Sequence, residues 1–138
     1  MLLMLEDDAE RIDKFRAALH VIDPALSLRI WNDAWTMIRE VEAFLPSACL
    51  ISLDHDLEPS GPNDPGTGWD VTKFLVTLQP VCPIIIHSSN ADRASWMMGE
   101  FELEGWEYHR LPPLGDDWIE HDWHHLVRRL LRRKRRSR

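Results

Sequence analysis

The segment CLISLDHD, residues 49–56, passes from an apolar run directly into three ionisable side chains. Two more segments have the same construction: LLMLEDD at residues 2–8 and PIIIHSSN at residues 83–90. Nearly continuous short apolar runs are typical of strands that are buried on both faces of a parallel sheet. We therefore predict three central parallel strands, each with polar side chains at its carboxyl end.

Segments with helical periodicity alternate with these strands. Helices are expected at 9–20, 34–45, 69–78, 91–103 and 116–133, and two further strands at 26–31 and 106–111. Five strands, each followed by a helix, predict an α/β fold with helices on both faces of a parallel sheet. Apolar and polar residues alternate in the second predicted strand, and the fifth has only a weak strand pattern. We therefore place both strands at the edges of the sheet. The result is a flavodoxin-like three-layer sandwich with strand order 2-1-3-4-5.

The charge is divided unevenly along the 138 residues. Residues 1–127 hold eight basic and all 23 acidic residues, a net charge of −15, whereas residues 128–138 hold eight basic residues. This division excludes a uniformly basic nucleic-acid binder. We expect residues 1–127 to form one domain whose last helix starts near residue 116. Residues 128–138 would be the basic end of that helix and a tail.

The composition indicates a cytoplasmic protein. Apolar runs are too short for a membrane span, and the apolar residues 1–5 lead straight into Glu6, Asp7 and Asp8 without the basic flank of a signal peptide. Two cysteines, Cys49 and Cys82, fit a reducing compartment. Neither belongs to a paired motif, so a structural zinc site is not expected.

The carboxyl ends of the strands form the candidate site, since ligands bind there in such folds. The carboxylates of Glu6, Asp7, Asp54 and Asp56 would repel one another unless a cation lies among them. Oxygen ligands favour Mg²⁺, or Mn²⁺, and Arg110 at the end of the fifth strand would face a phosphate held by that ion. Acids at strand ends can also be solvated loop residues or helix caps, and Asp8 is expected to cap the first helix.

With these features the chain resembles the response-regulator receiver domain over nearly its whole length. By this likeness Glu6 and Asp7 would hold Mg²⁺ together with Asp54 and the backbone carbonyl of Asp56. Asp54 lies at the phospho-accepting position, and Ser88 lies at the hydroxyl position after the fourth strand. The receiver's lysine after the fifth strand is absent.

Three motifs resemble a divergent lineage, the cyclic-phosphate processing receiver domains: LDHDL at 53–57, GWD at 68–70 and HSSN at 87–90. The resemblance implies chemistry on cyclic phosphates. Imidazoles suit the activation of water and the protonation of a leaving alkoxide, which makes His55 and His87 the candidate acid and base. Ser88 and Asn90 could donate hydrogen bonds to the phosphate. Alternatively, His55 packs under the following loop, on the opposite side of its strand from Asp54, and His87 bridges strands.

Three functions follow from these observations. The first is a metal-assisted phosphoesterase acting on cyclic or diester phosphates, such as a nucleotide or an RNA end. The second is a stand-alone receiver that is phosphorylated on Asp54 and signals through a partner. The third is a phosphate binder without catalysis. The basic segment Arg128–Arg138 either complements the helix dipole and docks on the acidic body, or contacts nucleic acid or an acidic protein.

Overall fold

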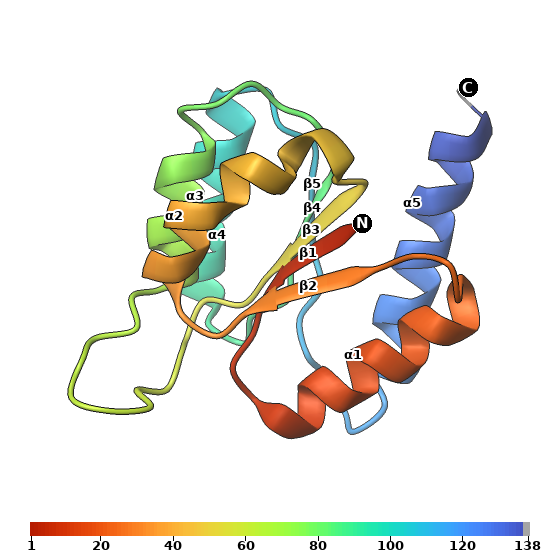
Figure 1. The fold of residues 1–138 in the computed structure, drawn as a ribbon, viewed down its shortest axis with the longest axis horizontal. Coiled ribbons are helices and arrows are strands. Elements are labelled where there is room, and N and C mark those ends of the chain that lie inside the picture. Colours follow the sequence, from red (N-terminus) through yellow and green to blue (C-terminus); the bar gives the residue numbers. More distant parts are fainter. Residues whose placement is uncertain (137–138) are drawn as a thin grey trace.

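The computed structural model describes residues 1–136 and shows a single parallel sheet in the order β2-β1-β3-β4-β5 (Figure 1). This order and the fold class confirm the prediction from the sequence. The strands are β1 (Leu2–Leu5), β2 (Leu28–Trp31), β3 (Leu50–Leu53), β4 (Ile84–Ile86) and β5 (Tyr108–Arg110).

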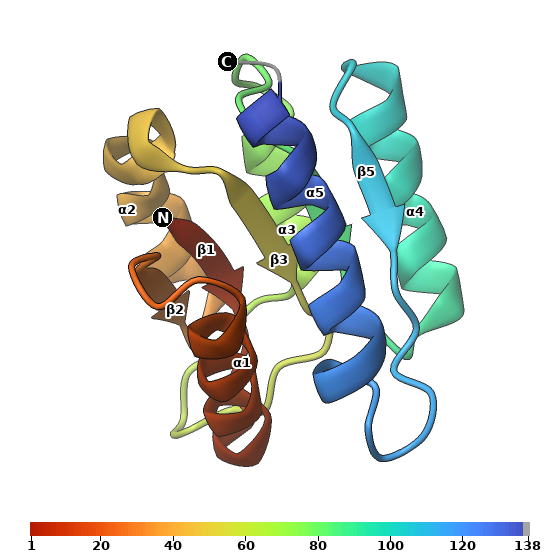
Figure 2. The ribbon, with the colours of Figure 1, turned by 90° about the vertical axis from the view of Figure 1, so that its right-hand side faces the viewer.

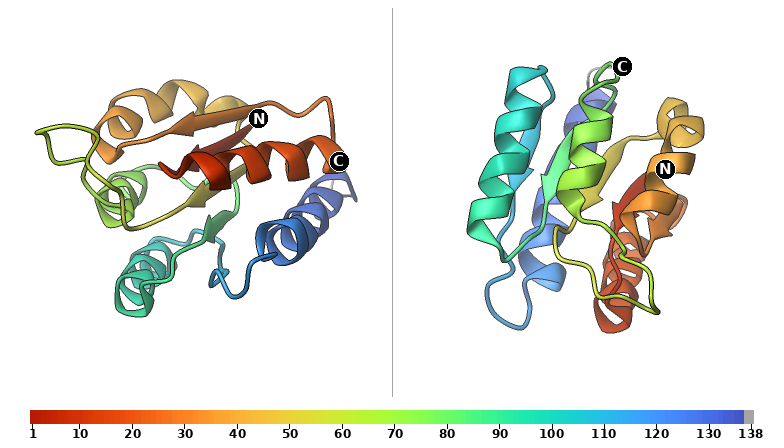
Figure 3. Two further views of the ribbon diagram at one scale, coloured as in Figure 1. Left: turned by 90° about the horizontal axis from the view of Figure 1, so that it is seen from below. Right: turned by 90° about the vertical axis from the view of Figure 1, so that its left-hand side faces the viewer.

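Helices cover both faces of the sheet. In Figure 2, α1 and α5 lie across one face, and Figures 1 and 3 show α2, α3 and α4 on the other. None of the helices among residues 1–136 is long and apolar enough to cross a membrane. The helices are α1 (Ala9–Ile22), α2 (Ala34–Phe44), α3 (Gly68–Leu75), α4 (Ala91–Leu103) and α5 (His124–Arg136).

The alternation of side chains along the central strands divides the core in two. Leu3, Leu5, Ile51 and Leu53 pack with α2, α3 and α4, whereas Leu2, Met4 and Leu50 pack with α1 and α5. Successive side chains of a strand point to opposite faces, so the central strands must be apolar at every position. The exception is Ser52 in β3, which is fully buried on the α1–α5 side.

The last helix differs from the predicted one at its start. Residues 116–118 form a turn, and Ile119–Trp123 form a single π-helical turn in which the amide of Trp123 donates to the carbonyl of Trp118 at 2.8 Å. From His124 the helix is regular and runs through the proposed boundary at residue 127 without a break. Leu130 and Leu131 are buried, so the first basic residues belong to a packed helix. Ser137 and Arg138 lie outside the described residues.

The loop between β3 and α3 is anchored to α2. The indole of Trp35 donates to the carbonyl of Asp64 at 3.0 Å, and the amide of Ala34 donates to the carbonyl of Pro65 at 2.7 Å. The carboxylate of Asp64 accepts from the amide of Gly66, a contact that stabilises the turn. Figures 1 and 3 show that the loop projects beyond α2, at the end of the sheet where the strands finish.

The motif at 68–70 joins this loop to α3 and has a structural explanation. Thr67 and Asp70 form a capping box at the start of α3. A β-carbon at Gly68 would lie 2.0 Å from the carbonyl oxygen of Asp54, so only glycine lets the helix approach this closely. The backbone that carries Asp54 therefore packs directly against the first turn of α3.

Replacing Gly68 by alanine is expected to destabilise the fold by about 1–3 kcal/mol, because the backbone at Asp54 or α3 must move. Gly99 in α4 is the matched control, since a β-carbon there meets nothing within 4 Å. Gly99→Ala should raise the free energy of unfolding by about 0.5–1 kcal/mol. Urea unfolding of both variants tests this, and equal effects would contradict the close contact.

Candidate functional site

The register of the sheet places Glu6, Asp54 and His87 side by side. Leu5 pairs with Leu53, and Leu53 pairs with Ile86, so the three polar residues follow one aligned row. The hydrogen bonds between strands continue one residue past the strand ends. The amide of Asp54 donates to the carbonyl of Leu5, and the amide of His87 donates to the carbonyl of Leu53. By alternation these side chains lie on the α1–α5 side of the sheet.

The carboxylates of Glu6, Asp7 and Asp54 converge at this edge. Each has an oxygen within 4.8 Å of the others. Glu6 is fully buried and Asp54 is only 6% exposed, while Asp7 is partly exposed and accepts a hydrogen bond from the amide of Glu58 in the loop. The sequence predicted these three residues as metal ligands, and the structure brings them together.

A chain of buried hydrogen bonds holds Glu6. Its Oε1 lies 3.2 Å from Nε2 of His87, whose Nδ1 lies 2.7 Å from the hydroxyl of Ser52. The indole of Trp123 donates to the same hydroxyl at 3.2 Å. Both ring nitrogens of His87 are engaged within the protein, Nδ1 by the hydroxyl of Ser52 and Nε2 by the carboxylate of Glu6. His87 is therefore a fully buried bridge between β1, β3 and α5.

The environment shifts the pKa values of the three carboxyl groups in different directions. Burial raises the pKa of Asp54 from 3.8 to about 6, with the charge of Glu6 adding to this and His87 opposing it. Burial also raises the pKa of Asp7. For Glu6 burial is the largest influence and acts upward, but the hydrogen bond and charge of His87, the amide of Asp8 and the charge of Arg11 together lower the pKa.

Arg11 supplies a cation that the sequence did not lead us to expect. Its Nη1 lies 3.7 Å from Oε1 of Glu6 and 3.8 Å from Oδ2 of Asp54, and its guanidinium lies over the ring of Trp118. The sequence did contain an indication of this role. Arg11 lies in the first turn of α1, where the helix dipole disfavours a positive charge, so a nearby carboxylate is expected as its partner.

The other candidate histidine, His55, lies differently. It is buried, and its Nδ1 lies 2.6 Å from Oδ1 of Asp56, whose side chain is 63% exposed. Its backbone carbonyl accepts from the amide of Gly68. The rings of His55 and His87 thus have separate partners, and His55 lies in a bend beyond the end of β3, where strand alternation no longer fixes the side of its ring. The carboxylate of Asp56 is engaged by His55, which leaves its backbone carbonyl as the group that the receiver likeness assigns to a metal.

The predicted phosphate-binding residues have structural tasks at the end of β4. The hydroxyl of Ser88 accepts from the amide of Asn90 at 3.1 Å, and the side chain of Asn90 caps α4 by accepting from the amide of Arg93. Arg110 donates from Nη2 to the carbonyl of Ser88 at 3.2 Å. Ser88 is buried, whereas Asn90 and Arg110 are partly exposed. Ser88 and Asn90 follow His87 in the chain, and Arg110 reaches them through its contact with Ser88, so the partners of all three are protein groups.

The donor set fits a divalent cation. Three carboxylates that face one another in a largely buried place carry more negative charge than Arg11 alone offsets; burial raises the pKa of Asp54 most, and the charge of Glu6 adds to that rise. Oxygen-only ligands suit Mg²⁺ or Mn²⁺. Glu6, Asp7 and Asp54 are therefore the residues that would hold such an ion.

Comparison with known proteins agrees with this arrangement. Residues 1–102 match the family described as the cyclic-phosphate processing receiver domain. No curated protein matches the chain.

Several solved structures share the fold. The signal receiver domain of a putative Luxo repressor protein from Vibrio parahaemolyticus has 19% identity and a TM-score of 0.65, with 99% of this chain and 93% of that one covered. The isolated REC domain of RcsB from Salmonella enterica serovar Typhimurium, solved with phosphomimetic BeF3-, has 15% identity and a TM-score of 0.63, with 91% and 86% covered. The N-terminal domain of an uncharacterized protein from Wolinella succinogenes has 14% identity and a TM-score of 0.70, with 99% and 98% covered.

Replacing Asp54 by asparagine should stabilise the metal-free protein by about 1–3 kcal/mol near pH 7, because it removes a buried charge. The folded pKa of about 6 exceeds the ordinary value of 3.8, so the folded state retains a proton longer. Wild-type stability should therefore fall as the pH rises through this window, and Asp54→Asn should remove that fall. Urea unfolding in a chelator measures both effects.

Excess Mg²⁺ should raise the stability of the wild type and leave Asp54→Asn nearly unchanged. Asp13→Asn, at an exposed position of α1, is the control and should alter stability by less than about 0.5 kcal/mol. A destabilised Asp54→Asn protein in chelator would contradict the repulsion inferred for the cluster.

His87→Leu should cost about 3–5 kcal/mol of unfolding free energy, since it leaves the carboxylate of Glu6 buried without its partner. His87→Gln retains a donor and an acceptor and should cost clearly less. Thermal unfolding of the two variants provides the comparison. Equal losses would mean that ring packing, not the hydrogen bond to Glu6, explains the importance of His87.

Proposed function

The chain belongs to the family of cyclic-phosphate processing receiver domains, and from this premise we propose that it hydrolyses a cyclic or diester phosphate at the carboxyl ends of its strands. The observation that carries the proposal is the convergence of Glu6, Asp7 and Asp54 beside Arg11. This arrangement offers ligands for a cation and a guanidinium for a phosphate within one small region.

In the proposed reaction a water oxygen attacks phosphorus, one P–O ester bond breaks, and the leaving alkoxide takes up a proton. A bound divalent ion would supply charge neutralisation for the phosphate oxygens and acidify the water. Without an ion, burial raises the pKa of Asp54 to about 6, so its carboxylate is a stronger base than that of an ordinary aspartate and can accept the proton of the water. Arg11 can move from the carboxylates to the phosphate oxygens, as a guanidinium pairs well with either.

The two histidines receive different roles in this proposal. Asp56 binds Nδ1 of His55, which fixes the ring and leaves Nε2 to deliver the proton to the leaving oxygen. Both nitrogens of His87 are engaged within the protein, so His87 is a positioning residue that holds Glu6. Ser88, Asn90 and Arg110 would bind the phosphate or the neighbouring group of the substrate.

A second candidate function has its own support. Asp54 ends β3 and Ser88 follows β4, the positions of the phospho-accepting and hydroxyl residues in the receiver likeness, and the solved neighbours are receiver domains. In this reading Asp54 is phosphorylated and the domain signals through a partner protein. The absence of the receiver's lysine after β5, where Leu111 precedes Pro112, favours hydrolysis instead.

A panel of 2′,3′-cyclic and 3′,5′-cyclic nucleotides incubated with Mg²⁺ or Mn²⁺ tests the proposal. We expect turnover by the wild type and a loss of at least about 100-fold in His55→Gln, the effect of removing a general acid. Asp54→Asn should be inactive, whereas His20→Gln, exposed at the far end of α1, should be unaffected. The readout is product formation by chromatography.

The same proteins distinguish the two functions. Stable labelling of Asp54 by acetyl phosphate, with no turnover of any cyclic nucleotide, would refute hydrolysis and support the signalling receiver. If Asp54→Asn still turned over a cyclic nucleotide, hydrolysis would not take place at the proposed site.

A further inference from the structure

Apart from the carboxylate cluster, a polar pocket of about 560 Å³ lies between the end of β5 and the start of the last helix. Most of its lining side chains carry or can carry a positive charge. They come from two segments that are distant in sequence, the end of β5 and the first turns of the last helix. The lining residues are His109, Arg110, Leu111, His121, Asp122, His125, Leu126 and Arg129.

The charges of this pocket favour an anion. Asp122 binds the ring of His121, and this hydrogen bond raises the pKa of His121. The acid next to His109, Glu107, is also held by Arg133 at 2.6 Å. Arg129 is exposed, and Nε of Arg110 is buried without a hydrogen-bond partner among the described residues. A phosphate oxygen would satisfy a donor of this kind.

A metal ion fits the pocket less well than an anion. The rings of His121 and His125 meet edge to face at 4.9 Å between centroids. Within residues 1–136, the His, Cys, Asp and Glu ligand atoms that converge in threes belong to Glu6, Asp7 and Asp54. The imidazoles of this pocket therefore serve better as donors to an anion than as metal ligands.

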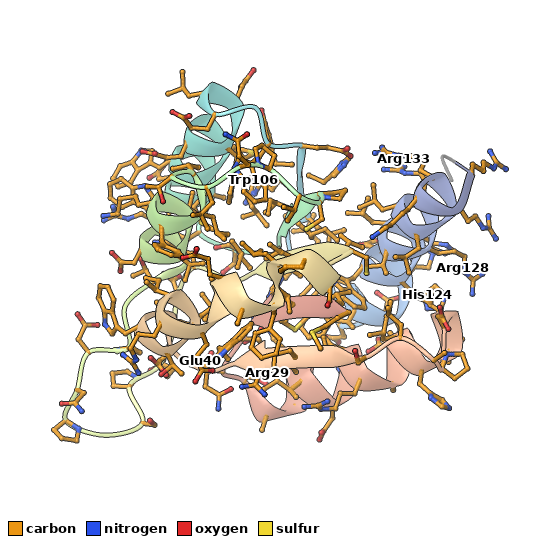
Figure 4. The ribbon with its side chains drawn as sticks, turned by 45° about the horizontal axis from the view of Figure 1, so that its top comes forward. Arg29, Glu40, Trp106, His124, Arg128 and Arg133 are labelled. Atoms are coloured by element: carbon orange, nitrogen blue, oxygen red, sulfur yellow. The ribbon has the colours of Figure 1, made fainter. Side chains whose placement is uncertain are left out.

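The pocket is connected to the candidate site and to the basic face of α5. Arg110 lines the pocket and also donates to the carbonyl of Ser88, at the end of β4 beside the site. On α5, His125, Arg129, Arg132 and Arg136 follow at helical spacing and are exposed, which makes one cationic stripe. Figure 4 shows basic side chains along α5, with Arg128 and Arg133 labelled; Arg133 is directed to Glu107, to which it donates a hydrogen bond.

We propose that this pocket binds a backbone phosphate of a nucleic-acid strand whose terminal phosphate lies at Glu6, Asp7 and Asp54. The inference rests on the proposed hydrolysis and names its substrate class: the end of an oligonucleotide rather than a free nucleotide. From His125 to Arg136 the stripe extends about 16 Å, at 1.5 Å per residue. That is about the length of a strand of four or five nucleotides at 3.4 Å each. Arginine side chains on a helix lean toward its N-terminus, here toward the pocket.

Fluorescence anisotropy with a labelled ten-residue oligoribonucleotide tests the inference. The double variant His125→Gln, Arg129→Gln should bind about tenfold more weakly at low salt, and its salt dependence should become shallower by about one unit of slope. Arg39→Gln removes one charge from the exposed surface of α2, on the opposite face of the sheet, and should change binding less than twofold. Circular dichroism confirms that the folds are equal.

The outcomes separate this inference from the proposed function. If the wild type turns over mononucleotides but the double variant binds the oligonucleotide like Arg39→Gln, the pocket inference is wrong and hydrolysis stands. If the oligonucleotide binds with the expected sensitivity but nothing is turned over, the pocket stands and hydrolysis is wrong. Equally tight, equally sensitive binding of a polyglutamate peptide would overturn the choice of nucleic acid as the ligand.

Discussion

The hydrogen bonds that run from Trp123 through Ser52 and His87 to Glu6 connect α5, β3, β4 and β1 in one buried line. Each group in the line is far from water, so each depends on its neighbour for a partner. Glu6 stays ionised in a buried place because His87 and Arg11 oppose the effect of burial on its pKa. The charged edge of the sheet and the position of the last helix therefore depend on the same few contacts.

The fold could be predicted from the sequence because the spacing of apolar residues differs between its strands and its helices. Buried parallel strands require apolar residues at nearly every position, and residues 2–5, 50–53 and 84–86 meet that requirement except at Ser52. The bounds of α4 were predicted correctly at Ala91–Leu103, whereas the cap formed by Asn90 was not predicted. α3 ends at Leu75 rather than at 78, and the last helix starts with a π-helical turn. Both depend on local packing that apolar spacing does not encode.

The site was readable in part, for a related reason. Parallel strands end at a common edge, so Glu6, Asp7 and Asp54 could be grouped without coordinates. Arg11, Trp118 and Trp123 come from helices that pack over that edge, and their approach is set by tertiary structure. Ser52 looked like an ordinary member of an apolar strand, although its hydroxyl joins Trp123 to His87. A lone polar residue in a doubly buried strand indicates a partner but does not name it.

The π-helical turn at Ile119–Trp123 acts as a phase shift between two halves of the last helix. One residue of an α-helix corresponds to about 100° of rotation, so the extra residue of a π turn sets the direction of everything after it. Before the turn, Trp118 faces Arg11 and His87; after it, Leu126 and Leu130 face the core while the arginines face outward. Deleting a single residue here would rotate the cationic stripe relative to the carboxylates at the edge of the sheet. The length of this turn thus couples the orientation of two surfaces that share no side chain.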